Sequence, residues 1–195
     1  MSQPPVIDLS AAPGAGESWD APRWKVYTWA LVEWLLVSSA WQVSSRLRRA
    51  VLVAFGARIG RGVILRPRLR VRLPWKLVVG DRSWIGEDVW LHNQDRLTIG
   101  SDAVVSQGTF VTTGSHALRH DMALVTRPVV IEDGAWITAR CVLLGGVKVG
   151  RSAVITPGTV VSHDVPPGVV YGRQDAVVIG PRFPGPGNPS DTGGG

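Results

Sequence analysis

An aliphatic residue recurs at every sixth position through one stretch of this chain, without a slip. The positions are Ile131, Ile137, Leu143, Val149, Ile155 and Val161. A period of six fits neither an α-helix nor a simple alternating strand, and it is typical of a β-helix in which each short strand adds one aliphatic side chain to an inner stack. Glycines between these positions tolerate the conformations that turns require. The stretch therefore predicts a solenoid of short parallel strands.

The same period returns upstream in three further runs. They are Ile59/Leu65/Val71, Val79/Ile85/Leu91/Leu97 and, after a shift of two residues, Ile99/Val105/Val111. Between Val111 and Val129 the register disappears, and this excursion contains the sequence Gly114-Ser115-His116. Repeat proteins usually place ligand-contacting insertions on one face of the column, so we expect the chemistry of the protein in this excursion.

The composition divides the chain into four parts. Residues 57–180 are expected to form the solenoid domain, and residues 21–56 a helical N-terminal cap that covers its hydrophobic end. Residues 1–20 and 181–195 are rich in Pro, Gly and Ser, and we expect them to be disordered tails.

The segment from Trp24 to Ser45 contains no glycine or proline and is long enough for one helix, and a second helix is expected from about Ser44 to Phe55. Glu33 in the middle of the first segment makes a membrane crossing costly. Four tryptophans, at positions 24, 29, 34 and 41, have basic residues on both sides. Two interpretations stay open, namely a helix that packs on the end of the column and a helix in peripheral contact with a membrane.

The net charge of +6 comes mostly from arginines. No aromatic-interleaved basic groove or nucleic-acid motif accompanies them, so we expect no nucleic-acid partner. The single cysteine, Cys141, excludes an intramolecular disulfide and any multi-cysteine metal site. No secretory signal is recognisable at the N-terminus, which predicts a cytoplasmic protein, with the inner face of the membrane as an alternative place.

Several motifs occur in order and at matching spacing in one known family. They are Pro74-Trp75-Lys76-Leu77, Ile85-Gly86-Glu87-Asp88, Thr113-Gly114-Ser115-His116 and Ile131-Glu132-Asp133-Gly134-Ala135-Trp136. With them the chain resembles the left-handed β-helix hexapeptide-repeat acyltransferases, within which it is most similar to the colanic acid acetyltransferase branch of sugar O-acetyltransferases. The resemblance implies a left-handed parallel β-helix and a homotrimer. It also implies transfer of an acetyl group from acetyl-CoA to a hydroxyl of a sugar or exopolysaccharide precursor, without metal or covalent intermediate.

The resemblance also implies roles for individual residues. His116 matches the catalytic base, because a neutral imidazole can accept the proton of the acceptor hydroxyl. Asn93, Asp95 and His120 are the candidate acceptor-binding residues. The candidate cofactor-binding residues are Ala139, Pro157, Ser162, His163 and Arg173. The chain departs from the family pattern at Thr156, at His163, where relatives carry lysine, and in the segment 172–176.

Two other functions stay open. A γ-type carbonic anhydrase shares the fold and binds zinc through three histidines, but His92, His116 and His120 lack the matching positions on adjacent coils. A hexapeptide-repeat protein without catalysis would instead serve as a scaffold. Metal analysis and an acetyl-CoA cleavage assay distinguish these alternatives from an acetyltransferase.

Overall fold

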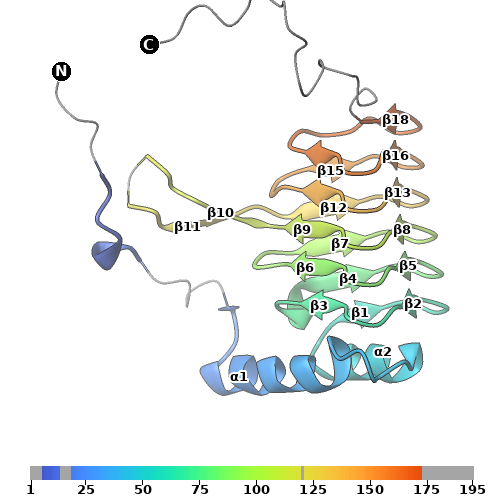
Figure 1. Cartoon of the computed structure of the whole chain (residues 1–195), viewed down its shortest axis with the longest axis horizontal. Helices are drawn as coiled ribbons and strands as arrows, with labels where there is room; N and C mark the ends of the chain where they lie inside the picture. The colour runs from blue at the N-terminus through green and yellow to red at the C-terminus, as the bar shows by residue number, and fades with distance from the viewer. Residues whose placement is uncertain (1–5, 14–18, 120, 173–195) are drawn as a thin grey trace, which may run out of the picture.

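The computed structural model describes residues 6–13, 19–119 and 121–172, and its main body is a column of short parallel strands (Figure 1). The first three coils are β1 (Arg58–Ile59), β2 (Ile64–Leu65), β3 (Arg70–Val71), β4 (Leu77–Val79), β5 (Trp84–Ile85), β6 (Trp90–His92), β7 (Leu97–Ile99), β8 (Val104–Val105) and β9 (Phe110–Thr112). After a hairpin come β12 (Val129–Ile131), β13 (Trp136–Ile137), β14 (Val142–Leu143), β15 (Lys148–Val149), β16 (Val154–Ile155), β17 (Val160–Val161) and β18 (Val170–Tyr171).

The strands stack into three parallel sheets, one for each side of the coil. Their orders are β1-β4-β7-β12-β15, β18-β16-β13-β8-β5-β2 and β17-β14-β9-β6-β3. The aliphatic residues predicted for the inner stack pair coil upon coil, as in Ile99 beside Ile131 and Ile137 beside Ile155, and they are buried. The predicted parallel β-helix is therefore confirmed.

The two-residue shift of the repeat has a structural cause. Leu97 lies two positions before Ile99 on β7, and both side chains are buried, so this strand contributes two residues to the core. Leu97 pairs with Leu77 on one side and with Val129 on the other, which makes a second inner stack along the same sheet. The shift therefore marks a wider corner between successive coils, and the column continues through it.

Two helices close the N-terminal end of the column. Helix α1 (Arg23–Val32) continues into a π-helical turn (Glu33–Val37), and α2 (Ser45–Ala54) follows. The helical segment predicted to reach Ser45 therefore ends at Val37. Trp29, which is 2% exposed, donates a hydrogen bond from its indole nitrogen to the carbonyl of Val71 at 2.9 Å. The cap thus packs on the first coil. No helix in the described ranges has the length and apolar character needed to cross a membrane.

Arg48 fixes α2 to the column from inside. Its guanidinium is fully buried and donates to the backbone carbonyls of Val37 at 3.0 Å, of Leu65 at 2.8 Å and of Gln42. A buried guanidinium is tolerated only when its donors are occupied, so these contacts define one seating of the cap. Most of the two predicted tails, including all of 181–195, lies outside the described residues.

Candidate functional site

The predicted excursion is a β-hairpin that leaves the column between β9 and β12 (Figure 1). Its strands are β10 (Gly114–His116) and β11 (Leu124–Thr126), which pair antiparallel with His116 opposite Leu124. At its base the amide of Arg127 donates to the carbonyl of Thr113 at 2.8 Å, and the hydroxyl of Thr113 accepts from the amide of Asp95 at 2.8 Å. These bonds fix the hairpin to the neighbouring coil, so a side chain on β10 has a defined position.

His116 lies at the outer end of β10 with its side chain exposed. Its Nδ1 atom is 2.8 Å from the carbonyl oxygen of Met122 across the hairpin tip. A carbonyl oxygen can only accept a hydrogen bond, so Nδ1 carries the hydrogen and the Nε2 atom of the neutral ring keeps its lone pair. This is the tautomer that a general base needs.

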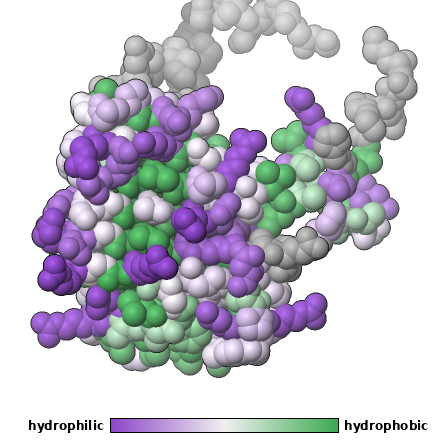
Figure 2. Space-filling view, turned by 180° about the vertical axis from the view of Figure 1, so that it is seen from behind, coloured by the Kyte–Doolittle hydropathy of each residue, from purple (hydrophilic) through white to green (hydrophobic). Residues whose placement is uncertain are grey.

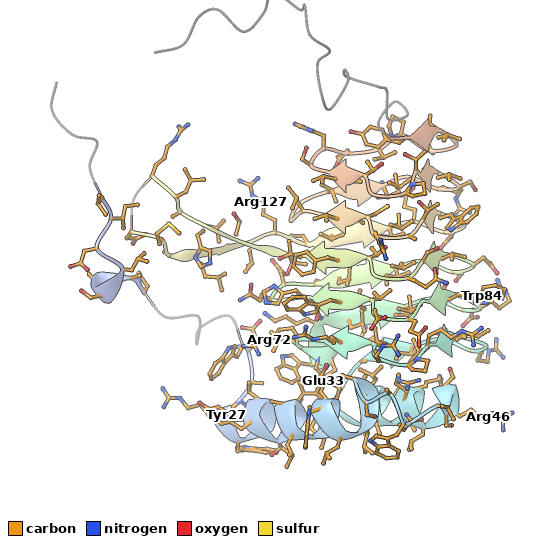
Figure 3. The ribbon with its side chains drawn as sticks, in the orientation of Figure 1. Tyr27, Glu33, Arg46, Arg72, Trp84 and Arg127 are labelled. Atoms are coloured by element: carbon orange, nitrogen blue, oxygen red, sulfur yellow. The ribbon has the colours of Figure 1, made fainter. Side chains whose placement is uncertain are left out.

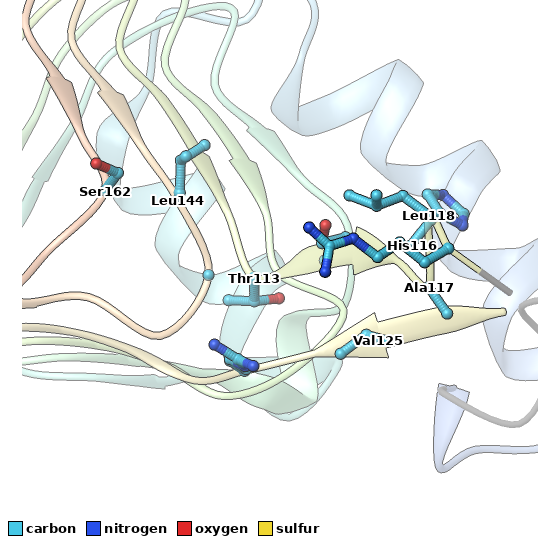
Figure 4. A pocket seen from close by; sticks show the side chains of 12 residues that line it. Thr113, His116, Ala117, Leu118, Val125, Leu144 and Ser162 are labelled. Carbon is cyan, nitrogen blue, oxygen red and sulfur yellow. The ribbon is translucent and has the colours of Figure 1, made fainter. Parts of the chain in front are cut away.

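A cavity of about 530 Å³ extends from the hairpin to the column (Figure 4). Its lining residues are Thr113, Gly114, Ser115, His116, Ala117, Leu118, Arg119, Val125, Arg127, Leu144, Gly145 and Ser162. His116 and Ser162 were predicted for different roles, as base and as cofactor contact, and the structure brings both to this one cavity. The lining also contains Arg119 and Arg127, which the sequence reasoning missed. The sequence feature that could have indicated them is the presence of two arginines inside the excursion between Val111 and Val129.

The other predicted cofactor residues lie elsewhere on the column. Ala139 and Pro157 occupy the corner before β14 and β17, where the amide of Gly158 donates to the carbonyl of Ala139 at 3.0 Å. Ser162 follows β17, and its hydroxyl lies 3.0 Å from Nδ1 of His163. Ala139 and Pro157 therefore precede β14 and β17, whereas Ser162 and His163 follow β17 at its other end.

The predicted acceptor residues differ in their surroundings. Asn93 is fully buried, and its amide is used inside the column, because Nδ2 donates to the carbonyl of Leu73 at 2.7 Å and Oδ1 accepts from the amide of Leu73 at 3.1 Å. Asp95 is half-buried and accepts from the amide of Arg96. Acceptor contact by either residue stays a prediction. His120 and Arg173 lie outside the described residues.

A second, smaller cavity of about 160 Å³ separates α1 from the outer face of β3 and β6. Its lining residues are Val26, Trp29, Ala30, Glu33, Arg70, Val71, Arg72, Trp90 and His92. The guanidinium of Arg70 lies 4.0 Å from the centre of the Trp90 ring, and Figure 3 shows Glu33 on the column side of α1, near Arg72. This polar cluster was not predicted, although Arg70 and Trp90 are neighbours in the coil register.

Burial changes the ionisation of two groups in the second cavity. It raises the pKa of the Glu33 carboxyl, against the opposing effect of a backbone hydrogen bond from Val71 and of the charges of Arg70 and Arg72. Burial, followed by the charges of Arg72 and Arg70, lowers the pKa of the His92 imidazole. The neutral imidazole is therefore favoured there. The cavity offers a carboxyl, two cations and a neutral ring to a polar ligand.

Two of the three histidines of the zinc alternative, His92 and His116, lie apart, and His120 is outside the described residues. His92 lines the second cavity and His116 the first, and the described part of the chain contains no group of three His, Cys, Asp or Glu side chains placed to hold a metal ion. Cys141 is buried and has no disulfide partner.

Comparison with known proteins places the chain in a family. No family model matches the sequence. The chain is 36% identical over 160 residues to the "Putative colanic acid biosynthesis acetyltransferase WcaF" of Escherichia coli (strain K12), a match that covers 81% of this chain and 87% of that protein. It is 21% identical over 136 residues to galactoside O-acetyltransferase of the same organism, covering 68% and 67% of the two chains.

The solved structures that are similar share the fold. One is a hexapeptide-repeat acetyltransferase of Vibrio cholerae complexed with acetyl coenzyme A, with a TM-score of 0.69 and 22% identity over 80% of this chain and 91% of that one. Another is a maltose O-acetyltransferase of Clostridium difficile, with a TM-score of 0.67 and 18% identity over 82% and 92% of the two chains. With the identity to the colanic acid protein over most of both sequences, this chain belongs to the hexapeptide-repeat acetyltransferases.

Proposed function

We propose that the protein transfers an acetyl group from acetyl-CoA to a hydroxyl of a sugar or polysaccharide precursor, with His116 as the general base. The observation that carries the proposal is the bond between Nδ1 of His116 and the carbonyl of Met122, which leaves Nε2 free at a cavity of sufficient size for a substrate. The names of the relatives support the acetyl donor and the sugar acceptor, since they include a galactoside O-acetyltransferase and a protein complexed with acetyl coenzyme A.

The proposed reaction is a direct transfer. Nε2 of His116 accepts the hydroxyl proton while the acceptor oxygen forms a bond to the thioester carbonyl carbon. The bond from this carbon to sulfur then breaks, and the imidazolium returns the proton to the departing thiolate. The products are the O-acetylated acceptor and CoA thiol, and His116 ends neutral, so neither a metal nor a covalent enzyme intermediate is needed.

The cations that line the cavity beside the hairpin suit acetyl-CoA, because this acetyl donor carries phosphate groups. Arg119 and Arg127 line this cavity together with Ser162, and guanidinium groups bind phosphate oxygens with charge-assisted hydrogen bonds. We propose that these three residues bind acetyl-CoA. Further proposed contacts along the length of acetyl-CoA are Ala139, Pro157, His163 and Arg173.

We also propose that the enzyme is a homotrimer. Two observations support a partner subunit. The residues proposed to contact acetyl-CoA lie at opposite ends of β14 and β17, so a groove completed by a second copy of the chain would join them. The outer face of the six-stranded sheet is also apolar, with Trp84 56% and Trp136 48% exposed. Figure 2 shows hydrophobic residues gathered in a band along the column.

We propose the second cavity as a further candidate site for the acceptor, in addition to the residues Asn93, Asp95 and His120. Glu33, Arg72 and His92 offer both donors and acceptors of hydrogen bonds, which sugar hydroxyls require. The use of acetyl-CoA and the lone buried cysteine fit a cytoplasmic location, which is part of the proposal.

The decisive experiment measures release of CoA thiol from acetyl-CoA with a panel of sugars and glycan precursors, alongside acetyl-CoA binding by calorimetry. Turnover with at least one acceptor, lost in His116→Ala, is the expected result. Absence of both binding and turnover across the panel would replace the enzyme with the scaffold alternative.

A further inference from the structure

We propose that the outward face of the N-terminal cap docks on the surface of an anionic lipid bilayer. This cap face consists of large apolar side chains that the column leaves uncovered. Its members are Trp24, Tyr27, Leu31, Trp34, Leu35, Trp41, Val43 and Leu47. The proposal concerns where the protein resides and is independent of the chemistry at His116.

The helical spacing places the members from α1 and the following turn on one side. Trp24, Tyr27, Leu31 and Trp34 follow one another at intervals of three or four residues, which aligns them along a single face of a helix. Trp24 is 68%, Trp34 66% and Trp41 69% exposed. Tryptophan and tyrosine are the residues that prefer the headgroup region of a bilayer, where the ring lies among apolar chains and its polar atom meets water.

The charge around the cap face is complementary to anionic lipid. Residues 23–58 contain six lysines and arginines and a single acidic residue, Glu33. Glu33 faces the second cavity on the column side of the helix, whereas Arg23, Arg46 and Arg58 are exposed. Figure 3 shows Tyr27 toward one end of the cap and Arg46 toward the other. Cations beside interfacial aromatic side chains are the pattern of a helix that lies in the membrane interface.

The geometry of α1 relates this surface to the second cavity. Val26 and Trp29 line the second cavity from the column side of α1. The cap-face members Trp24, Tyr27 and Leu31 are exposed on the opposite side of the same helix. A helix with its side chains is about 10 Å across, so a docked cap holds the second cavity within roughly that distance of the lipid headgroups. On the proposed function, this position suits an acceptor anchored in the bilayer.

The test is sedimentation of the full chain with vesicles of phosphatidylglycerol and phosphatidylethanolamine, compared with vesicles of phosphatidylcholine alone. The unmodified protein should bind the anionic vesicles and lose most of this binding in molar salt. The triple variant Trp24→Gln/Trp34→Gln/Trp41→Gln should bind at least about tenfold more weakly. Arg46→Glu should weaken binding several-fold, since each cation near the surface contributes about 1 kcal/mol.

Arg140→Glu is the matched charge control, because Arg140 is exposed between β13 and β14, far along the column from the cap, and it should bind as the unmodified protein does. Circular dichroism and transfer of acetyl to a soluble acceptor, which should persist in the triple variant, separate a docking defect from unfolding or from failure of the enzymatic proposal. Equal vesicle binding by the triple variant and the unmodified protein would overturn the proposal. A larger oligomer that the triple variant abolishes, without vesicle binding, would instead assign the cap face to contacts between copies.

Discussion

Across the tip of the β10–β11 hairpin, the Nδ1 atom of His116 lies 2.8 Å from the carbonyl oxygen of Met122. Met122 has a φ of 58°, which a residue with a long side chain seldom adopts, and the carboxylate of the preceding Asp121 accepts the amide of Ala123 at 2.9 Å. The turn therefore presents a backbone acceptor to the imidazole. Among the described residues, a backbone carbonyl of the hairpin tip, rather than an acidic side chain, defines the tautomer of the proposed base.

His116→Ala should lower kcat for acetyl transfer by roughly 10² to 10⁴, the usual contribution of a general base. The side chain is exposed, and the bond to Met122 is its one side-chain hydrogen bond among the described residues, so the Tm should change little. Thiol release and thermal unfolding of the same preparation measure both effects. A variant that keeps a tenth or more of the activity would remove His116 from the mechanism.

Asp121 should act as a positioning residue. Asp121→Ala removes the acceptor for the Ala123 amide and loosens the turn that carries Met122, so we expect kcat to fall about tenfold while KM for acetyl-CoA stays the same. Asp121→Asn retains the accepting oxygen and should restore most of the activity. If the alanine and asparagine variants lose activity equally, the charge of Asp121 matters, and the positioning role is wrong.

Arg127→Gln should raise KM for acetyl-CoA about tenfold with little change in kcat, because a charge-assisted contact to a phosphate is worth about 1.5 kcal/mol or more. Arg66→Gln is the control, since Arg66 is exposed on the first coil and does not line the cavity that contains Arg127. Steady-state kinetics with varied acetyl-CoA measures the effect. Equal KM values for the two variants would exclude Arg127 from donor binding.

The column could be predicted from the sequence because each inner position of a β-helix demands one aliphatic residue at a fixed interval. Ile131 to Val161 meet that demand without exception, and the structure buries all six. The hairpin was predictable only as a gap in the period. Its strands are three residues each, too short for a pattern of their own.

The site was predicted only in part, for a physical reason. His116 and Ser162 are brought to one cavity by the fold, although 45 residues separate them in sequence. The cavity between α1 and the column depends on how a helix rests on a coil, and no interval in the sequence encodes that contact. From the sequence, Glu33 could be interpreted only as a charge that opposes membrane insertion. In the structure it lines the same cavity as Arg70 and Arg72.

Gly100→Ala should destabilise the column far more than Gly158→Ala. A Cβ at Gly100 would lie 2.4 Å from the side-chain Oδ1 and 2.5 Å from the backbone nitrogen of Asp133 on the next coil, so the coils would have to separate. We expect a loss of about 3 kcal/mol or more in the free energy of unfolding. Gly158 has nothing within 4 Å of its Cβ direction, and its φ of 70° costs an alanine only about 1 kcal/mol. Denaturant unfolding of both variants measures the difference, and similar losses would contradict the close packing at Gly100.

The second cavity should give the fold a measurable pH dependence through His92. Burial and the charges of Arg72 and Arg70 lower its pKa below the ordinary value of about 6.5, so the unfolded chain binds this proton more readily than the folded one. The resulting contribution to stability is fully present above about pH 6.5 and is lost as the pH falls toward the folded pKa. Thermal unfolding from pH 8 to pH 5 should therefore show the unmodified protein losing more stability than His92→Gln, which does not titrate.

Glu33 has the opposite effect on the pH dependence of stability, because burial raises the pKa of its carboxyl. The folded state therefore binds this proton more tightly than the unfolded state, which favours folding as the pH falls. It is present in both proteins, and the difference between their curves therefore isolates His92. Repeating the pair in a Glu33→Gln background removes the coupling between the two groups. Parallel Tm curves for the two proteins of a pair would show that His92 titrates as it does in water, which would contradict the buried cluster at α1.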